Sequence, residues 1–305
     1  MASKQSAQDS IDDSSAPLIE HLAELRTRLI WSVVDFVVGM LICFAFGDQL
    51  LDFLLMPIEA TMRSLGNPNP VMQYTAPQEY FFTLIRISMV GGLALSFPVI
   101  AYQMWRFVAP GLYRSEKQAF LPFLIASPVL FLAGASFAHF VVVPMAMKFF
   151  LGFADLPSYV AALVTGQGEP ASSERGIEIV FNGKVNETLD ITLKMIVAFG
   201  LCFQLPVLLT LMGKAGLASS RGLRSVRKYA IVAILTVAAL VTPPDVTTQV
   251  ILFTVVYGLY EISIYLVQWV EKKKDEEARA EGIIGEDESL FDVDEDEDDE
   301  GDTKA

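Results

Sequence analysis

Apolar runs about as long as a membrane-spanning helix constrain this sequence more than any other feature. A helix needs about 20 apolar residues to cross the hydrocarbon core of a bilayer, because each residue adds about 1.5 Å to its length. Such runs recur along the chain and are separated by polar segments that contain proline and glycine. The sequence therefore predicts an all-α, polytopic membrane protein rather than a soluble domain, in agreement with its 53% of hydrophobic residues.

We expect six transmembrane helices, of which the fifth is unusually short. The run Tyr229–Val241 is about 20 Å long as a helix, whereas the hydrocarbon core is ~30 Å thick. The segment Thr242-Pro243-Pro244-Asp245 behind it predicts a tight reversal of the chain. Prolines of the second, third and fourth helices predict kinks, and hence a curved, concave bundle; they are Pro98, Pro122, Pro128, Pro144 and Pro206. The expected spans cover about residues 29–47, 80–108, 119–143, 191–212, 229–241 and 248–270.

Shorter elements are expected between the spans. The stretch 48–66 has the pattern of an amphipathic surface helix, and we expect Pro57 to interrupt it. The polar segment 151–190 has the composition of a loop, in which Gly176–Val185 is a candidate hairpin. Helix-start signals, two of them capping boxes, occur at Ser14–Pro17, Thr75–Gln78 and Ser115–Gln118.

The distribution of charge predicts the orientation of the chain. Lysine and arginine residues gather before span 1, between spans 2 and 3, between spans 4 and 5, and after span 6. Both termini are therefore expected in the cytoplasm. Residues 271–305 hold 17 acidic and five basic residues, so the net charge of −14 belongs mainly to this tail. We accordingly divide the chain into a cytoplasmic segment 1–16, a membrane domain 17–270 and a disordered acidic tail 271–305.

No motif for a nucleotide, a metal or a catalytic nucleophile occurs in the sequence. The cysteines Cys43 and Cys202 are isolated from each other, and His139 is interpreted as a polar residue packed in span 3. We therefore expect no enzyme, no cofactor, no metal site and no nucleic-acid partner.

Carboxylates next to arginines on the expected cytoplasmic side are the remaining candidates for function. Glu24 and Arg28 are four residues apart, which suits an ordinary helix ion pair. Glu116 follows Ser115, where a carboxylate complements the helix dipole. Taken singly, each residue has a purely structural explanation.

Together with several longer blocks, these residues resemble the TatC subunit of the twin-arginine translocase. The blocks occur in the family's order over about residues 17–270. They are His21–Arg26, Thr75–Thr83, Phe97–Tyr113, Glu116, Phe199–Val207 and Leu240–Val246.

The resemblance implies a receptor that binds the paired arginines of export signal peptides. Such a receptor is the core subunit of a complex that exports folded proteins across the bacterial inner membrane with the proton motive force. It implies TatA- and TatB-type single-span subunits and further copies of the chain as partners within the lipid bilayer. The implied signal-peptide site consists of Glu24, Glu116, Leu25, Arg26 and Phe107.

Further positions that matter in the family correspond to Pro57, Pro98, Gln204 and Asp245. At Gln204 many relatives carry Glu, so a protonation role there is not expected in this chain. The main alternative function is an ion-coupled secondary transporter, although such folds usually contain two repeated halves and none is found here. A purely structural scaffold is a third alternative, but it leaves the cytoplasmic carboxylates unexplained.

Overall fold

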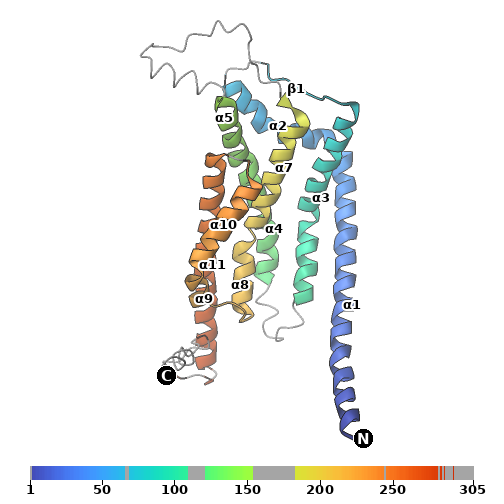
Figure 1. The fold of residues 1–305 in the computed structure, drawn as a ribbon, viewed down its shortest axis with the longest axis vertical. Coiled ribbons are helices and arrows are strands. Elements are labelled where there is room, and N and C mark those ends of the chain that lie inside the picture. Colours follow the sequence, from blue (N-terminus) through green and yellow to red (C-terminus); the bar gives the residue numbers. More distant parts are fainter. Residues whose placement is uncertain are drawn as a thin grey trace, which may run out of the picture. The chain divides into compact units, whose positions relative to one another are not determined.

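The computed structural model describes residues 2–65, 69–108, 121–153, 183–243 and 245–280, together with residues 282, 283, 285 and 291. These residues are almost entirely helical (Figure 1), which confirms the all-α expectation. The long helices are α1 (Ala2–Ala45), α2 (Gly47–Ser64), α3 (Pro77–Val108), α4 (Leu121–Phe137), α5 (Val143–Phe153), α7 (Val185–Cys202), α8 (Leu205–Lys214), α10 (Arg227–Val241) and α11 (Val246–Ala280). The short elements are η3 (Ala138–Val142), α9 (Ser220–Ser225), β1 (Met72–Gln73) and β2 (Gly183–Lys184).

Five helical runs within the described residues are long and apolar enough to cross a membrane. They are Leu22–Ala45, Pro77–Met104, Pro122–Phe153, Val185–Lys214 and Val246–Ala280. The expected fifth span forms α10, whose 15 residues extend about 22 Å and fall short of the ~30 Å core. A polytopic membrane protein is thus confirmed, while the count of six spans stays a prediction.

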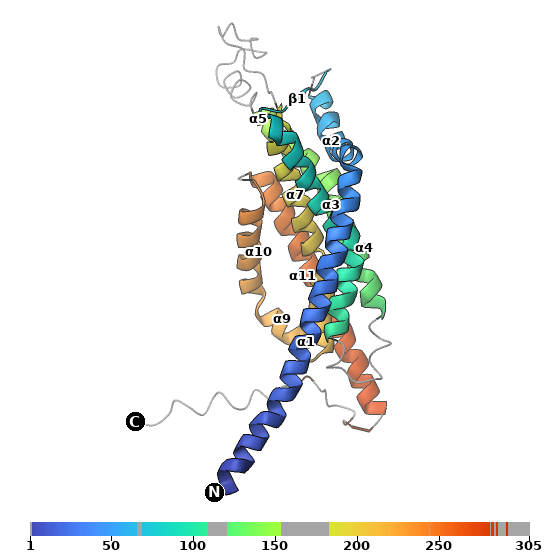
Figure 2. The ribbon, with the colours of Figure 1, turned by 90° about the vertical axis from the view of Figure 1, so that its right-hand side faces the viewer.

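The described chain divides into two compact units, which consist of residues 1–204 with 237–252 and of residues 205–236 with 253–305. In the first unit α1 runs beside α3 (Figures 1 and 2). The two backbones approach closely at Gly39 and Gly92, where a Cβ atom on Gly92 would lie 2.6 Å from the Met40 nitrogen. Small residues permit such close helix contacts in a membrane, where van der Waals packing replaces the hydrophobic drive.

A second close contact joins α4 to α7. A Cβ atom on Gly134 would lie 2.5 Å from the carbonyl oxygen of Phe199. Phe131 of α4 stacks on Phe97 of α3 with ring centroids 4.1 Å apart. The π-helical turn η3 follows α4 and buries His139, which stacks on Phe53 of α2. The interpretation of His139 as a packed polar residue is therefore confirmed.

Several local expectations were wrong in detail. Helix α1 begins at Ala2, well before the predicted start at Ser14–Pro17. Pro57 lies inside α2 and does not interrupt it, because the helix continues to Ser64. The partner of Thr75 at the start of α3 is Glu79 and not Gln78, since Glu79 accepts bonds from the Thr75 amide at 2.6 Å and hydroxyl at 2.9 Å.

The long loop also differs from its expectation at the end that the structure describes. Gly183–Lys184 forms β2 and pairs in parallel with Met72–Gln73 of β1. The expected pairing within Gly176–Val185 is not seen there, and the rest of that segment lies outside the described residues, as does Ser115–Gln118. Helix α7 begins at Val185, earlier than the expected span, and two residues separate its end from the start of α8.

In the second unit, the basic segment before α10 is held against α11. The Ser220 amide donates to Glu271 Oε1 at 2.7 Å, and Arg227 Nη2 donates to Glu261 Oε2 at 2.6 Å. Tyr260 donates its hydroxyl to the Leu223 carbonyl at 2.7 Å. Helix α11 continues to Ala280, past the expected end of the last span at Val270, and most of the acidic tail lies outside the described residues.

Candidate functional site

Arg28 joins α1 to the end of α3. Its Nη2 atom donates to Glu24 Oε1 at 2.6 Å, one helical turn away, and its Nη1 atom donates to Gln103 Oε1 at 3.3 Å. Arg28 precedes Gly39 by eleven residues, and Gln103 follows Gly92 by eleven residues. This equal spacing is expected for two antiparallel helices that cross at the two glycines. The glycine contact therefore sets the register that brings Gln103 to Arg28.

A pocket of about 510 Å³ opens at this place between α1 and α3. Its lining residues are Ala23, Glu24, Thr27, Arg28, Trp31, Gln103 and Arg106. The side chains of Glu24 and Arg28 are only 33% and 18% exposed, so water screens their ion pair less than a fully exposed one. An aromatic wall, a carboxylate and two guanidinium groups thus meet in one open cavity.

The described lining of this pocket carries one negative and two positive charges. Glu24 is the carboxylate, and Arg28 and Arg106 are the cations. A carboxylate has about four acceptor positions on two oxygens, so one carboxylate can bond more than one guanidinium. A further cation is nevertheless repelled by Arg28 and Arg106 unless a second carboxylate joins the pocket.

The other residues of the expected signal-peptide site have mixed outcomes. Leu25 and Arg26 are exposed on α1, but they do not line the pocket. Phe107 belongs to the last turn of α3, and its side chain lies outside the described residues, as does Glu116 altogether. The structure thus brings Glu24 into a pocket and leaves the pairing of Glu24 with Glu116 a prediction.

Gln204 and Asp245 each have a structural role in this chain. Gln204, between α7 and α8, accepts a bond from the Ser127 hydroxyl at 2.6 Å and donates to the Ser127 carbonyl at 2.9 Å. Asp245 is 2% exposed and caps α11, because its Oδ2 accepts the Thr248 amide at 2.7 Å and its Oδ1 accepts the Thr248 hydroxyl. This cap satisfies one of the backbone donors in the first turn of α11 that have no partner within the helix.

The two prolines singled out by the resemblance lie inside helices. Pro57 is buried in α2, and its carbonyl accepts the Thr61 hydroxyl at 2.8 Å. Pro98 lies within α3, directly after the stacked Phe97. Neither residue contributes to the pocket lining.

The sequence interpretation missed Gln103, Arg106 and Trp31 as pocket residues. Gln103 and Arg106 are part of the block Phe97–Tyr113, but nothing local in that block connects them with α1. A glycine on each of two antiparallel helices, used as a common crossing point, would have placed Gln103 opposite Arg28. In the part of the chain that the structure describes, no group of three or more His, Cys, Asp or Glu side chains could hold a metal ion.

Comparisons with known proteins agree on one family. The family model described as Sec-independent protein translocase protein (TatC) matches residues 20–254. The chain is 42% identical to TatC of Magnetococcus marinus over 88% of this chain and 90% of that protein, and 39% identical to TatC of Aquifex aeolicus over 87% and 100%. A crystal structure of a twin-arginine translocase receptor TatC matches with a TM-score of 0.65 at 37% identity, over 82% of this chain and 99% of that chain. The chain therefore belongs to the TatC family of Sec-independent protein translocase proteins.

Proposed function

We propose that this TatC family member is the signal-peptide receptor and core subunit of a twin-arginine translocase. It would bind the paired arginines of an export signal peptide and, with the proton motive force, take part in exporting folded proteins. The solved relative that it resembles is described as a twin-arginine translocase receptor. The family match favours this function over a secondary transporter.

The pocket around Glu24 is the observation that carries the proposal. It opens beside a half-buried carboxylate that already holds one guanidinium, that of Arg28, at 2.6 Å. The same planar geometry suits an arginine of a peptide, since a guanidinium fork can bond a carboxylate through two parallel N–H groups. A lysine ammonium has no such fork, so a site built on carboxylates prefers paired arginines to paired lysines.

A second carboxylate would make the pocket able to accept two cations. Glu116 would offset one of the two positive charges at the pocket, and each carboxylate would then hold one arginine of the peptide. Leu25, Arg26 and Phe107 lie on the same two helices as the pocket and would contact the flanks of the peptide. The proposal thus assigns charge recognition to Glu24 and Glu116 and flank contacts to the other three residues.

The remaining parts of the proposal concern placement and partners. The chain would lie in the bacterial inner membrane with both termini in the cytoplasm, as the distribution of basic residues predicts. Single-span subunits of the TatA and TatB types and further copies of this chain would assemble around it. The short helix α10 would leave the bilayer locally thin or the ends of the helix outside the hydrocarbon.

Signal-peptide binding to charge-neutral variants tests the proposal. A charge-assisted bond contributes about 1.5–3 kcal/mol. Glu24→Gln or Glu116→Gln should therefore lower the affinity for the signal peptide about ten- to a hundredfold. The full chain would be purified in detergent and photocrosslinked to a signal peptide with paired arginines or paired lysines. We expect the arginine peptide to lose its advantage in each variant and in the double variant.

Glu59→Gln is the matched control. Glu59 pairs with Arg63 four residues away on α2 with an N–O distance of 2.8 Å, the same arrangement as Glu24 with Arg28, but it lies outside the pocket. This control should keep the arginine preference and the wild-type yield. Wild-type crosslinking of the double variant Glu24→Gln/Glu116→Gln would refute the assignment of these residues.

A further inference from the structure

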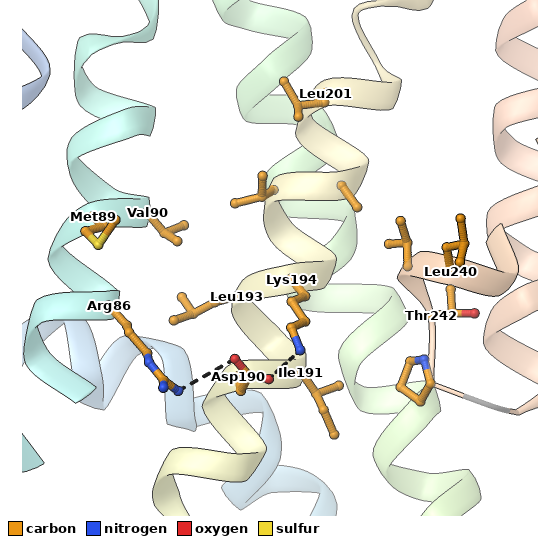
Figure 3. Close-up of a pocket in the computed structure, with 14 residues that line it drawn as sticks. Arg86, Met89, Val90, Asp190, Ile191, Leu193, Lys194, Leu201, Leu240 and Thr242 are labelled. Carbon is orange, nitrogen blue, oxygen red and sulfur yellow. Dashed lines mark ion pairs between the residues drawn. The ribbon is translucent and has the colours of Figure 1, made fainter. Parts of the chain in front are cut away.

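A groove of about 820 Å³ lies in the first unit (Figure 3) and shares no lining residue with the Glu24 pocket. Its walls come from α3, from α7 and from the residues around the end of α10. Most of the lining is apolar. The apolar lining residues are Met89, Val90, Ile191, Leu193, Val197, Ala198, Leu201, Leu240, Val241 and Pro243. The polar lining residues are Arg86, Asp190, Lys194 and Thr242.

The charged residues gather at one end of the groove. Figure 3 shows Arg86 reaching from α3, and Lys194 from α7, towards Asp190. Lys194 Nζ lies 2.6 Å and Arg86 Nη1 lies 3.7 Å from the Asp190 carboxylate. Arg86 Nη1 also donates to Asn186 Oδ1 at 3.0 Å. Both cations are thereby held at the same carboxylate and on the same groove end.

The cluster of Arg86, Lys194 and Asp190 has a net charge of +1 and more hydrogen-bond donors than Asp190 and Asn186 accept. Arg86 and Lys194 contribute two positive charges against the single negative charge of Asp190. A guanidinium carries five N–H donors and an ammonium carries three, more than Asp190 and Asn186 use. The side chains of Arg86 and Lys194 are 48% and 65% exposed. A singly charged anion with several acceptor oxygens would balance the charge and use these donors.

Spacing along the helices places this cluster at the edge of the hydrocarbon core. Arg86 and Arg106 on α3 are twenty residues apart, which is about 30 Å of helix and equals the ~30 Å thickness of the core. Basic residues of α3 therefore mark both boundaries, and Arg86 lies at one of them, beside Asp190 and Lys194.

We propose that this groove is a binding site for an anionic phospholipid. Its phosphate would accept bonds from Arg86 and Lys194, and one acyl chain would lie along Val90, Val197 and Leu201. The polar end is at the depth of the lipid headgroups, and the aliphatic walls are at the depth of the lipid tails. The net charge of +1 complements a lipid of charge −1, such as phosphatidylglycerol, and not a zwitterionic one. This site is separate from the Glu24 pocket and does not depend on the proposed function.

Lipid retention by the full-length protein tests the proposal. The purified protein would be titrated with phosphatidylglycerol or phosphatidylcholine, and bound lipids would be counted by native mass spectrometry. We expect phosphatidylglycerol to bind at least tenfold more tightly in the wild type. In Arg86→Gln/Lys194→Gln the two lipids should bind within about twofold of each other. Glycerophosphoglycerol, the deacylated form of phosphatidylglycerol, keeps the single negative charge of the phosphodiester but has no acyl chain, and it should not displace the lipid at equal concentration.

The control Arg63→Gln/Lys148→Gln removes the same number of positive charges from exposed residues outside the groove. It should keep the preference for phosphatidylglycerol. Equal binding of the two lipids by the wild type, or a preference that survives in Arg86→Gln/Lys194→Gln, would overturn the proposal. Displacement of the lipid by glycerophosphoglycerol would show an anion site without an acyl groove and would contradict the proposal. A co-purified single-span polypeptide in place of the lipid would assign the groove to a partner helix.

A second variant keeps both cations and tests the groove even if the charge variants do not fold. Leu201 is 52% exposed on the groove wall, so Leu201→Trp places a fluorophore beside the expected acyl chain. The emission that this residue adds to that of the three native tryptophans should be quenched more by phosphatidylglycerol with brominated chains than by brominated phosphatidylcholine. Leu132→Trp, at a 51% exposed position of α4 outside the groove, should be quenched equally by both. Equal quenching at residue 201 contradicts the lipid site.

Discussion

Arg28 forms an ion pair with Glu24, the carboxylate that the proposed function assigns to the signal peptide. Removing the Arg28 guanidinium should therefore tighten peptide binding. Its Nη2 atom lies 2.6 Å from Glu24 Oε1, where a peptide guanidinium would bind. A peptide arginine must therefore displace or share this bond. We propose Arg28→Met as the test, because methionine keeps an unbranched stem and removes the charge and the donors.

The expected size of the effect follows from the burial of the pair. Exposed ion pairs contribute about 0.2–1 kcal/mol, and this pair is at the upper end because its side chains are only 18% and 33% exposed. A contribution of ~1 kcal/mol corresponds to about fivefold in affinity. Removing one of the two described pocket cations also reduces the repulsion of a cationic peptide, which acts in the same direction. The dissociation constant should therefore fall about fivefold or more.

Fluorescence anisotropy of a labelled signal peptide with paired arginines would measure this affinity at low and at moderate salt. The gain in Arg28→Met should shrink as salt rises, because screening weakens the repulsion. Arg63→Met is the matched control, since Arg63 pairs with Glu59 on α2 outside the pocket. Unchanged or weaker peptide binding by Arg28→Met would show that Arg28 orients Glu24 for the peptide and does not compete with it.

Two further predictions concern helix packing and topology. Gly92→Leu should lower the thermal unfolding temperature and the yield of the folded protein, because even a Cβ atom there would lie 2.6 Å from the Met40 nitrogen. The control Ser88→Ala, on the same helix, removes one hydroxyl bond to the Leu84 carbonyl and should change both quantities far less. A stable Gly92→Leu protein would contradict the close α1–α3 contact. Reporter fusions after residues 66, 165 and 246 should be active outside the cytoplasm and fusions after 113, 220 and 275 inside it, and an external signal at residue 220 would refute the six-span topology.

Hydropathy predicted the five long apolar helices, because a helix satisfies its own backbone hydrogen bonds within the membrane. The pairing of Glu24 with Arg28 was likewise predictable, since residues four apart on a helix are neighbours. The choice of Glu79 over Gln78 was not, because it depends on the exact first residue of α3. That helix begins at Pro77, which places Glu79 within reach of the Thr75 and Ala76 amides.

Contacts between distant segments had no local signal in the sequence. Strands β1 and β2 are each two residues long and are more than a hundred residues apart in the chain. Such short strands are not predicted by an alternation of apolar and polar residues. The same holds for Asp190, whose contacts with Arg86 and Lys194 were not predicted from the sequence. Its role depends on α3 and α7 presenting all three side chains on one groove end.

Helix α3 connects the two sites and explains why they can be separated by experiment. It contributes Arg86 to the lipid groove and, twenty residues later, Arg106 to the Glu24 pocket. The Glu24 pocket also needs α1, whose place on α3 depends on the contact of Gly39 with Gly92. The groove needs α7 instead, and none of its lining comes from α1. A change in the α1–α3 contact should therefore disturb the pocket first, whereas a charge change at Arg86 and Lys194 should leave the bond between Arg28 and Glu24 intact.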